Sequence, residues 1–208
     1  RAAAGEVMGK NDRIISVETS YSDGENASYR LMSNGFEGES KSTWYSVSAS
    51  VAIKGEGEAR PSDYWYGSSL FYDKLPKTDI GSVALERVLR KLGQKKAKSG
   101  KYTMVVDPIN SGRMLSPVLS ALYGSSLQQK NSFLIDKLDQ KVFSDKLTVM
   151  DDPHVIGANG SRYFDNEGVA TEHRPIFENG VLKTYFFDTY NAKKMGVAPT
   201  ISGPSRLG

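Results

Sequence analysis

The chain has 208 residues, of which 38% are hydrophobic and 25% are charged, and its net charge is +3. This is the composition of an ordinary globular protein with one large or two small domains. The chain contains no cysteine, which excludes disulfides, thiolate metal sites and a cysteine nucleophile. No apolar run approaches the roughly 20 residues that span a bilayer, and the net charge is too small to indicate nucleic-acid binding. We therefore expect a cytoplasmic protein that has no membrane contact.

The first part of the chain, residues 13–75, has the pattern of antiparallel β structure. In residues 45–53 every second position is apolar and most of the others are serine. This alternation predicts a strand with one buried side and one solvent-facing side. The solvent-facing side is expected to carry Ser46, Ser48 and Ser50. Neighbouring strands are expected at 14–21 and 28–32. Asp23-Gly24 and Asn34-Gly35 are expected to form the turns.

An aromatic cluster follows, made of Tyr64, Trp65, Tyr66, Phe71 and Tyr72. Because aromatic side chains dominate the energetics of cores and interfaces, we expect these residues to pack in a core or at a domain interface. A peptide-binding wall is the alternative.

A stripe of apolar residues at helical spacing predicts a helix over residues 79–92. Thr78 or Asp79 is expected to cap its start, and Gly93 is expected to end it. Residues 95–101 contain four lysines and little apolar content. We interpret them as an exposed linker between a domain at 1–94 and a domain at 102–208, since charge runs between ordered segments are usually solvated. A nucleic-acid patch is the alternative, but no aromatic residues are interleaved to stack bases.

The last part of the chain combines short elements of both kinds. A strand is expected at 102–106 and another at 146–150, and a helix within 111–123 has Pro117 in its first turn or at a kink. Asn179-Gly180 lies between two extended runs and predicts a type I′ hairpin. The sequence further predicts a helix capped by Asp188 and closed by Gly196. The predicted fold class is therefore α+β: an antiparallel β-rich N-terminal piece with a helix, followed by the start of a second, mostly β domain.

Two carboxylates, Asp165 and Glu167, are the first candidates for chemistry. In an extended segment they point to the same side, where they could form an acid/base pair or a cation site. The alternative is an Asx turn at Asp165 with a bend at Gly168. The two histidines, His154 and His173, lack the spacing of a zinc motif, and the sequence contains no H-E-x-x-H.

Three motifs carry a resemblance to a known family. They are D-N-E-G-V-A-T at 165–171, E-N-G-V-L at 178–182 and D-T-Y-N-A at 188–192. These resemble the signature of the TldD/PmbA proteins, a family of peptidase-related subunits that also bears the older label of modulators of DNA gyrase. Further segments resemble its PmbA (TldE) branch: S-F-L at 132–134, D-P-H at 152–154 and D-Y-W-Y at 63–66.

The resemblance implies that the chain is part of a longer protein. Family members are considerably longer and have an N-terminal α/β domain and a C-terminal domain rich in β structure. Residues 1–94 are therefore expected to be the later part of the first domain, and residues 102–208 the beginning of the second.

The resemblance also bears on metal binding. The TldD branch carries zinc on an H-E-x-x-x-H helix that follows a strand like 102–106. On this sequence the motif falls on Ser116, Pro117 and Ala121, and none of these side chains can ligate zinc or act as a general base. We therefore expect no cofactor in this chain, zinc on a TldD-like partner, and no activity of the chain alone.

The expected function is that of a non-catalytic PmbA-like subunit of a TldD/TldE-type zinc metallopeptidase. Its partner is a metal-bearing TldD-like subunit or a second copy, and its substrates are unfolded or extended peptides, in peptide-precursor maturation and antitoxin degradation. We expect the hairpin at 172–187 to line the substrate channel, because Pro175 indicates an arm with an unpaired edge. The candidate channel residues are Asp165, Glu167, His173, Asn179 and Gly180.

Two alternatives remain open. The first is an independent metal-dependent hydrolase whose site uses His154, His173, Asp165 and Glu167. The second is a DNA-gyrase-modulating binding protein, which the modest charge of the chain disfavours.

Overall fold

The computed structural model describes residues 1–208, and it has the expected α+β class, with antiparallel sheets and a few helices. The chain forms two compact units. Unit 1 consists of residues 1–29 and 39–101, and unit 2 consists of residues 30–38 and 102–208. None of its helices is both long and apolar enough to cross a membrane.

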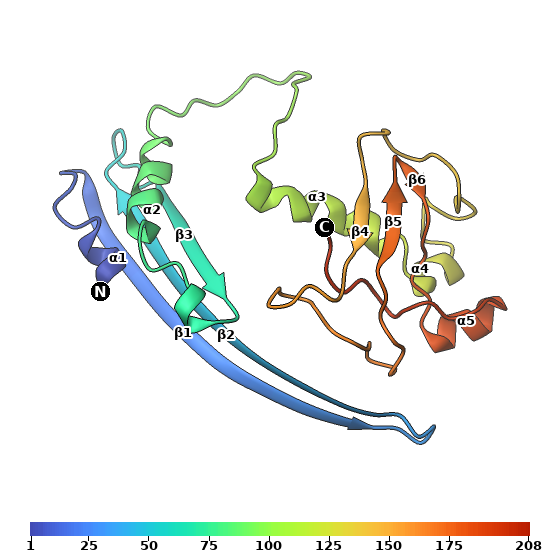
Figure 1. Ribbon diagram of the computed structural model, residues 1–208. Coiled ribbons are helices and arrows are strands. Elements are labelled where there is room, and N and C mark those ends of the chain that lie inside the picture. Colours follow the sequence, from blue (N-terminus) through green and yellow to red (C-terminus); the bar gives the residue numbers. More distant parts are fainter. The chain divides into compact units, whose positions relative to one another are not determined.

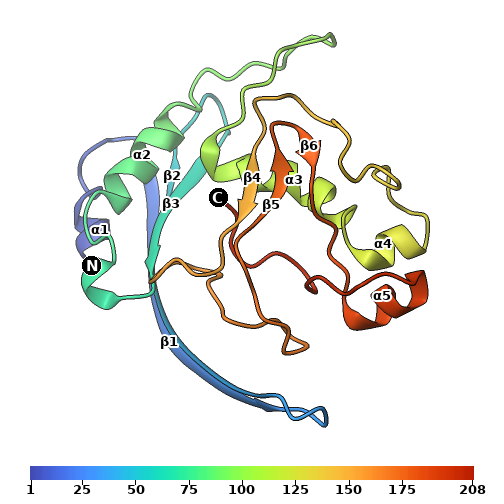
Figure 2. The ribbon, with the colours of Figure 1, turned by 45° about the vertical axis from the view of Figure 1, so that its right-hand side comes forward.

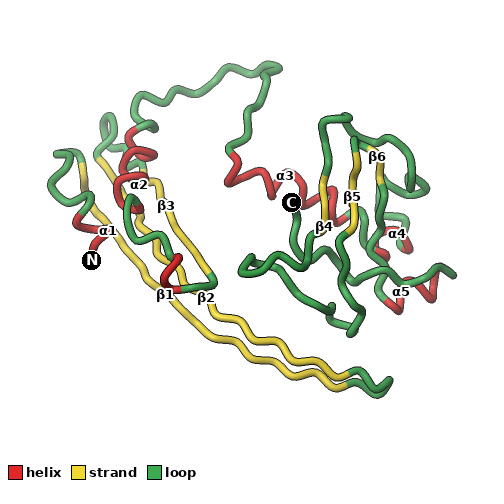
Figure 3. Tube along the Cα trace, in the orientation of Figure 1, coloured by secondary structure: helices red, strands yellow, loops and turns green.

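Unit 1 is built on a three-stranded sheet of order β1-β2-β3 (Figures 1 and 3). Its elements are α1 (Ala2–Gly5), β1 (Ile14–Leu31), β2 (Glu37–Ile53), β3 (Ser62–Ser69), the 3-10 helix η1 (Tyr72–Lys74) and α2 (Ile80–Leu89). The pair β2–β3 is antiparallel, with Val47 opposite Gly67 and Val51 opposite Asp63. The first two strands extend far beyond β3 as a two-stranded ribbon (Figure 1).

The turn predicted at Asp23-Gly24 does not form, because β1 runs through these residues without interruption. The ring of Trp44 lies against the backbone of Gly24, where a Cβ atom would come within 2.6 Å of the indole Nε1. An aromatic ring that covers a strand glycine stabilises it in the ribbon. The predicted turn at Asn34-Gly35 does form, and Gly35 has the positive φ of 88° that glycine permits.

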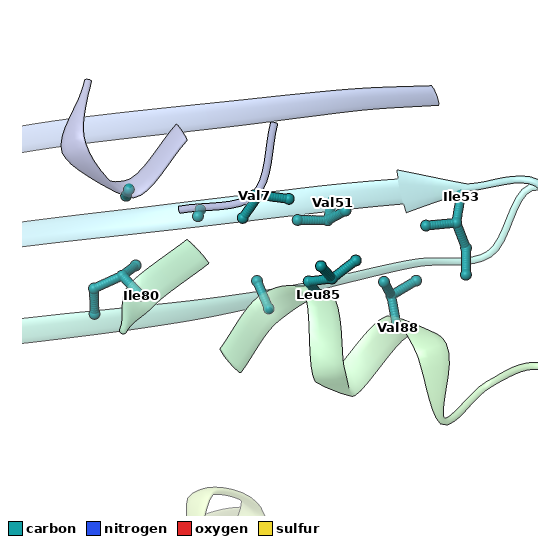
Figure 4. Packing of buried hydrophobic residues seen from close by; sticks show 9 residues of the cluster. Val7, Val51, Ile53, Ile80, Leu85 and Val88 are labelled. Carbon is teal, nitrogen blue, oxygen red and sulfur yellow. The ribbon is translucent and has the colours of Figure 1, made fainter. Parts of the chain in front are cut away.

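The core of unit 1 lies between one face of the sheet and the helices α1 and α2 (Figure 4). Ala49, Val51 and Ile53 are buried on this face, as their alternation with serine predicts. They pack against Ile80 and Val88 of α2. The opposite face of the sheet therefore carries the serines.

Helix α2 starts next to Asp79, but its free N–H groups are bound by a different residue from the one predicted. Asp79 makes no capping bond with its own side chain and has a left-handed φ of 65°. The Glu6 carboxylate instead accepts the backbone N–H groups of Asp79, Gly81 and Ser82. A carboxylate at this position also interacts favourably with the positive end of the helix dipole.

Unit 2 is built on a smaller sheet of order β4-β5-β6, surrounded by helices (Figure 2). Its elements are α3 (Pro108–Ser120), α4 (Gly124–Gln128), β4 (Val149–Asp151), β5 (Arg174–Glu178), β6 (Val181–Leu182) and α5 (Thr189–Met195). Ile176, Phe177, Leu182 and Phe186 are at the centre of its core.

One prediction in this unit is wrong. Residues 102–106 form no strand; they have no ladder partner, and Val105 is 92% exposed. Of the two alternatives predicted for Pro117, the structure has the second: helix α3 begins at Pro108, where Asp107 accepts the N–H of Ile109 as N-cap, so Pro117 lies inside the helix and not in its first turn. The stronger start signal is the combination of an Asp cap and a proline at the first helical position.

Candidate functional site

The family-like motif 165–171 forms a tight loop around the carboxylate of Asp165. This side chain is 1% exposed and accepts three backbone N–H groups. Oδ1 accepts Glu167 N at 2.8 Å and Val169 N at 2.9 Å, and Oδ2 accepts Ser202 N at 2.9 Å. The first of these bonds is the Asx turn given above as the alternative, and Gly168 supplies the bend with a φ of 77°.

The environment of Asp165 keeps it ionised. Burial by itself would raise the pKa of this carboxyl, but the N–H groups of Ser202, Val169 and Glu167 outweigh burial and lower the pKa below its ordinary value. A carboxylate that is already saturated with N–H donors is a poor proton acceptor. Asp165 is therefore suited to fixing the loop and the residues near Ser202.

The Glu167 carboxylate binds the start of α5. Its Oε2 accepts the backbone N–H of Thr189 at 2.7 Å and the Thr189 hydroxyl at 2.8 Å. Asp188, the predicted cap, accepts Asn191 N at 2.6 Å. Two carboxylates thus bind two of the free N–H groups at the start of one short helix, those of Thr189 and Asn191, where the helix dipole favours negative charge. Gly196 ends the helix with a φ of 67°, as predicted.

The tip of the long ribbon, residues 30–38, contacts the outer side of this loop within unit 2. The Arg30 guanidinium donates to the backbone oxygen of Asp165 at 2.9 Å. The ring of Phe36 lies against Gly168, where a Cβ atom would come within 2.7 Å of the ring, and meets Phe164 edge-on at 5.0 Å between centroids. The loop is therefore held from the ribbon tip, from α5 and from the segment near Ser202.

That segment, residues 202–206, is held almost entirely through its backbone by charged side chains. Besides Asp165, Arg162 donates to the carbonyl oxygens of Gly203 and Pro204. Asp151, fully buried, accepts the N–H groups of Ser205 and Arg206 through Oδ1. Main-chain recognition of this kind makes the position of the segment insensitive to most of its own side chains.

The two histidines do not come together with the two carboxylates. His154 Nε2 lies 3.1 Å from the hydroxyl of Thr171, the last residue of the motif. His173 is exposed just before β5. No three His, Cys, Asp or Glu side chains in the chain are grouped so that they could hold a metal ion.

The hairpin of β5 and β6 has the predicted tip but not the predicted edge. Asn179 and Gly180 both have positive φ, as a type I′ turn requires. However, β5 is the central strand of its sheet, so the edge inferred from Pro175 does not exist. Pro175 is tolerated because the register of β4 and β5 shifts at an irregularity next to its partner Met150.

The backbone of the hairpin tip is also engaged. Gly180 N donates to Leu147 O, and Gly180 O accepts the N–H groups of Val142 and Phe143. A main-chain template for an added peptide is therefore not available at this tip. Among the channel candidates, His173 and Asn179 have exposed side chains, whereas Gly180 is buried. Their role in a substrate channel stays a prediction.

The three positions of the missing zinc motif lie at the end of α3. Ser116 and Pro117 are exposed, and Ala121, just after the helix, is buried. The Ser116 carbonyl accepts the Ser120 hydroxyl at 2.9 Å. A hydroxyl, a pyrrolidine ring and a methyl group do not form a zinc donor set, so these residues do not fit the metal.

Sequence reasoning missed the contributions of Glu6, Arg30, Phe36, Asp151 and Arg162. The first three act on residues 73 to 135 positions away in the chain, and no local pattern marks such pairs. One local signal was available for Phe36. It directly follows the turn glycine Gly35, which places its ring at the tip of the hairpin, and Gly168 is a glycine in the motif against which such a ring can pack.

Comparison with known proteins gives two matches that together cover most of the chain. Residues 1–92 match the PmbA/TldA metallopeptidase central domain, and residues 99–207 match the PmbA/TldA metallopeptidase C-terminal domain. A metalloprotease PmbA homolog of Haemophilus influenzae is 35% identical over 76% of this chain and 35% of its own length.

Two solved structures are also similar. A protein from Bacteroides thetaiotaomicron that bears the name modulator of DNA gyrase is 69% identical, with a TM-score of 0.96 over 99% of this chain and 47% of that chain. TldE from Thermococcus kodakarensis is 20% identical, with a TM-score of 0.71 over 91% of this chain and 45% of that chain, which shows a shared fold. The chain thus spans between a third and a half of the length of these relatives. It belongs to the PmbA/TldD family of metallopeptidase-like proteins.

Proposed function

We propose that this chain is a PmbA (TldE)-like, non-catalytic part of a cytoplasmic TldD/TldE-type zinc peptidase, and that it acts on extended peptides only together with a metal-bearing subunit. The observation that carries the proposal is the end of α3. The family's metal helix would provide imidazoles and a carboxylate there, whereas this chain provides Ser116, Pro117 and Ala121.

The geometry of the motif supports the same proposal. Asp165 and Glu167 are occupied by backbone N–H groups of three segments, so each has a role in holding unit 2 together. The independent hydrolase would need these carboxylates beside the histidines, and no such group of metal ligands forms. The resemblance to the PmbA homolog, which covers 76% of the chain, agrees with the PmbA branch.

The test is elemental analysis for zinc together with a peptide cleavage assay. We expect no stoichiometric zinc in this chain alone, zinc after mixing with a TldD-like subunit, and cleavage of an unfolded peptide only by the mixture. Stoichiometric zinc in the chain alone, with cleavage that Glu167→Gln removes, would support the independent hydrolase and overturn the proposal. A steeply salt-dependent affinity for DNA would favour a gyrase modulator instead.

A further inference from the structure

The chain contains three Asn-Gly pairs, at 34–35, 159–160 and 179–180. The first and third form the turns of the two hairpins, whereas the second lies in the long loop between β4 and β5. An asparagine that precedes glycine can lose its side-chain amide in a reaction with the next backbone nitrogen, because glycine has no Cβ atom to hinder the approach. The three pairs can therefore be compared as sites of this covalent modification.

The reaction uses the backbone N–H of the glycine. Its nitrogen loses the proton and attacks the side-chain carbonyl carbon of the asparagine, a C–N bond forms, and the side-chain nitrogen leaves as ammonia. Water then opens the succinimide ring. Cleavage of the new C–N bond leaves aspartate, and cleavage of the original peptide C–N bond leaves isoaspartate, whose main chain runs through the side-chain carbons. In both cases one water is consumed and one ammonia is released.

A hydrogen bond from the glycine N–H opposes this reaction, since it has to be broken before the nitrogen can attack. The pair at 34–35 is protected in this way, because Gly35 N donates to Met32 O at 3.0 Å. Its asparagine is also held in place, since Asn34 Oδ1 accepts Phe36 N at 3.1 Å.

The pair at 179–180 is protected in the same manner. Gly180 is buried, and its N–H donates to Leu147 O at 2.8 Å. Asn179 is fixed in the hairpin turn with a φ of 49°, and its own N–H donates to the Thr148 hydroxyl at 3.2 Å. Neither reacting group can move without opening the hairpin.

The pair at 159–160 has no such protection. Asn159 and Gly160 are both exposed, and neither the Asn159 side chain nor the Gly160 N–H has a hydrogen-bond partner in the chain. The loop around them is nevertheless held, since Ser161 N donates to Ala158 O at 3.3 Å. The fold thus leaves the nucleophilic nitrogen and the amide of this one pair unengaged.

The same loop lies against the segment 202–206. Gly160 approaches this segment so closely that a Cβ atom would come within 2.4 Å of the Ser205 carbonyl oxygen. Ser205 is held there by the Arg162 guanidinium, which donates to its hydroxyl at 2.9 Å, and by Asp151, which accepts its N–H at 2.9 Å. Isoaspartate lengthens the main chain by one methylene group directly before Gly160. The contact with Ser205 leaves no room for a longer chain.

We propose that Asn159 is a site of spontaneous deamidation in the folded protein, and that its isoaspartate product loosens the segment 202–206. Asn34 and Asn179 precede glycine as well, but the fold protects them. The reaction takes up water as its single co-reactant. The proposal is independent of the proposed function, because it depends on the geometry of this loop alone.

Peptide mapping by mass spectrometry tests the site. The folded chain is incubated at neutral pH, and aspartate and isoaspartate are quantified over time at the three positions. We expect Asn159 to react roughly tenfold faster than Asn34 or Asn179, since the free energy of a protecting hydrogen bond corresponds to about this factor. In denaturant the three rates should become similar. Equal rates in the folded chain, or a slower reaction at Asn159, would overturn the assignment.

Amide hydrogen exchange tests the consequence. We expect Ser205 and Arg206 to exchange faster in the incubated chain than in the fresh one, because their N–H groups are bound within the segment that is loosened. The matched control is Asn159→Gln, whose longer side chain cyclises slowly, so incubation should leave its exchange unchanged. Exchange in the deamidated chain that is as slow as in the fresh chain would refute the loosening.

A second variant separates charge from chain length. Fresh Asn159→Asp carries the new negative charge but has a main chain of normal length. We expect its exchange at Ser205 and Arg206 to match that of the fresh unmodified chain. Faster exchange in this variant would overturn the assignment of the effect to the longer main chain.

Discussion

Replacing Asp165 by asparagine tests whether the motif carboxylate is a structural anchor. The amide keeps the shape of the side chain, but only its oxygen can accept hydrogen bonds. If that oxygen takes the place of Oδ1, it retains the bonds from Glu167 N and Val169 N, and the new NH₂ group faces Ser202 N. One hydrogen bond to a charged group is lost and a buried N–H is left unpaired, so we expect unit 2 to be destabilised by about 2–4 kcal/mol.

The two units can be monitored separately in one denaturation experiment. Both tryptophans, Trp44 and Trp65, lie in unit 1, so their fluorescence is expected to be unchanged by the substitution. Amide hydrogen exchange in β4 and β5 reports unit 2, and the exposed Asp145→Asn is the control. A change in unit 2 of less than about 0.5 kcal/mol, which is the range of neutral surface substitutions, would refute the reasoning.

The same substitution has a predictable pH dependence. Because the pKa of Asp165 is lowered in the folded state, its ionisation stabilises the protein above its unfolded pKa of about 3.9, and this stabilisation is lost as pH falls through the lower folded value. The difference between the unmodified chain and Asp165→Asn should therefore be constant near neutral pH and shrink below about pH 4. A difference that instead grows on acidification would contradict the assigned role.

Two further predictions concern the contacts of glycine residues. Phe36→Ala should accelerate amide exchange at Glu167 and Val169, because the Phe36 ring covers Gly168 and meets Phe164 edge-on. The control Leu31→Ala, at an exposed residue of the same ribbon, should leave this exchange unchanged. Equal exchange rates in both variants would show that the Phe36 ring does not hold the loop. Gly180→Ala should destabilise unit 2 by more than about 2 kcal/mol, since its Cβ would lie 2.3 Å from Phe143 O. Gly196→Ala should destabilise the protein by only about 1 kcal/mol, because Gly196 has a positive φ similar to that of Gly180 but open space around its Cβ position. Thermal unfolding of both variants measures the difference. A larger loss of stability for Gly196→Ala than for Gly180→Ala would exclude the steric explanation.

The features that could be predicted from the sequence are those set by neighbouring residues. Alternation of apolar residues and serine located the buried face of β2, and the Asn179-Gly180 pair and the Asp188 and Gly196 caps located the hairpin and α5. Each depends on backbone preferences or periodicity within a few positions. The family motifs were recognisable for the same reason.

The features that could not be predicted depend on residues far apart in the chain. Asp23-Gly24 has turn chemistry, but β1 continues through Gly24, where the ring of Trp44 packs against the backbone. Pro175 has the mark of an edge strand, but an irregular register accommodates it in a central one. In both cases a local preference is overridden by a partner that only the folded chain supplies.

The ribbon tip has a consequence for the order in which the molecule can be assembled. Arg30 and its acceptor at Asp165 are separated by 135 residues, so this contact closes most of the chain into a loop. During synthesis the tip must wait until the loop at 164–168 has left the ribosome, and contacts between residues so distant in sequence form slowly. A two-stranded ribbon is marginally stable by itself, so the tip is expected to be the last part of the hairpin to become protected during refolding. Unit 1 can therefore begin to fold first, but the hairpin tip at 30–38 becomes ordered only together with the rest of unit 2.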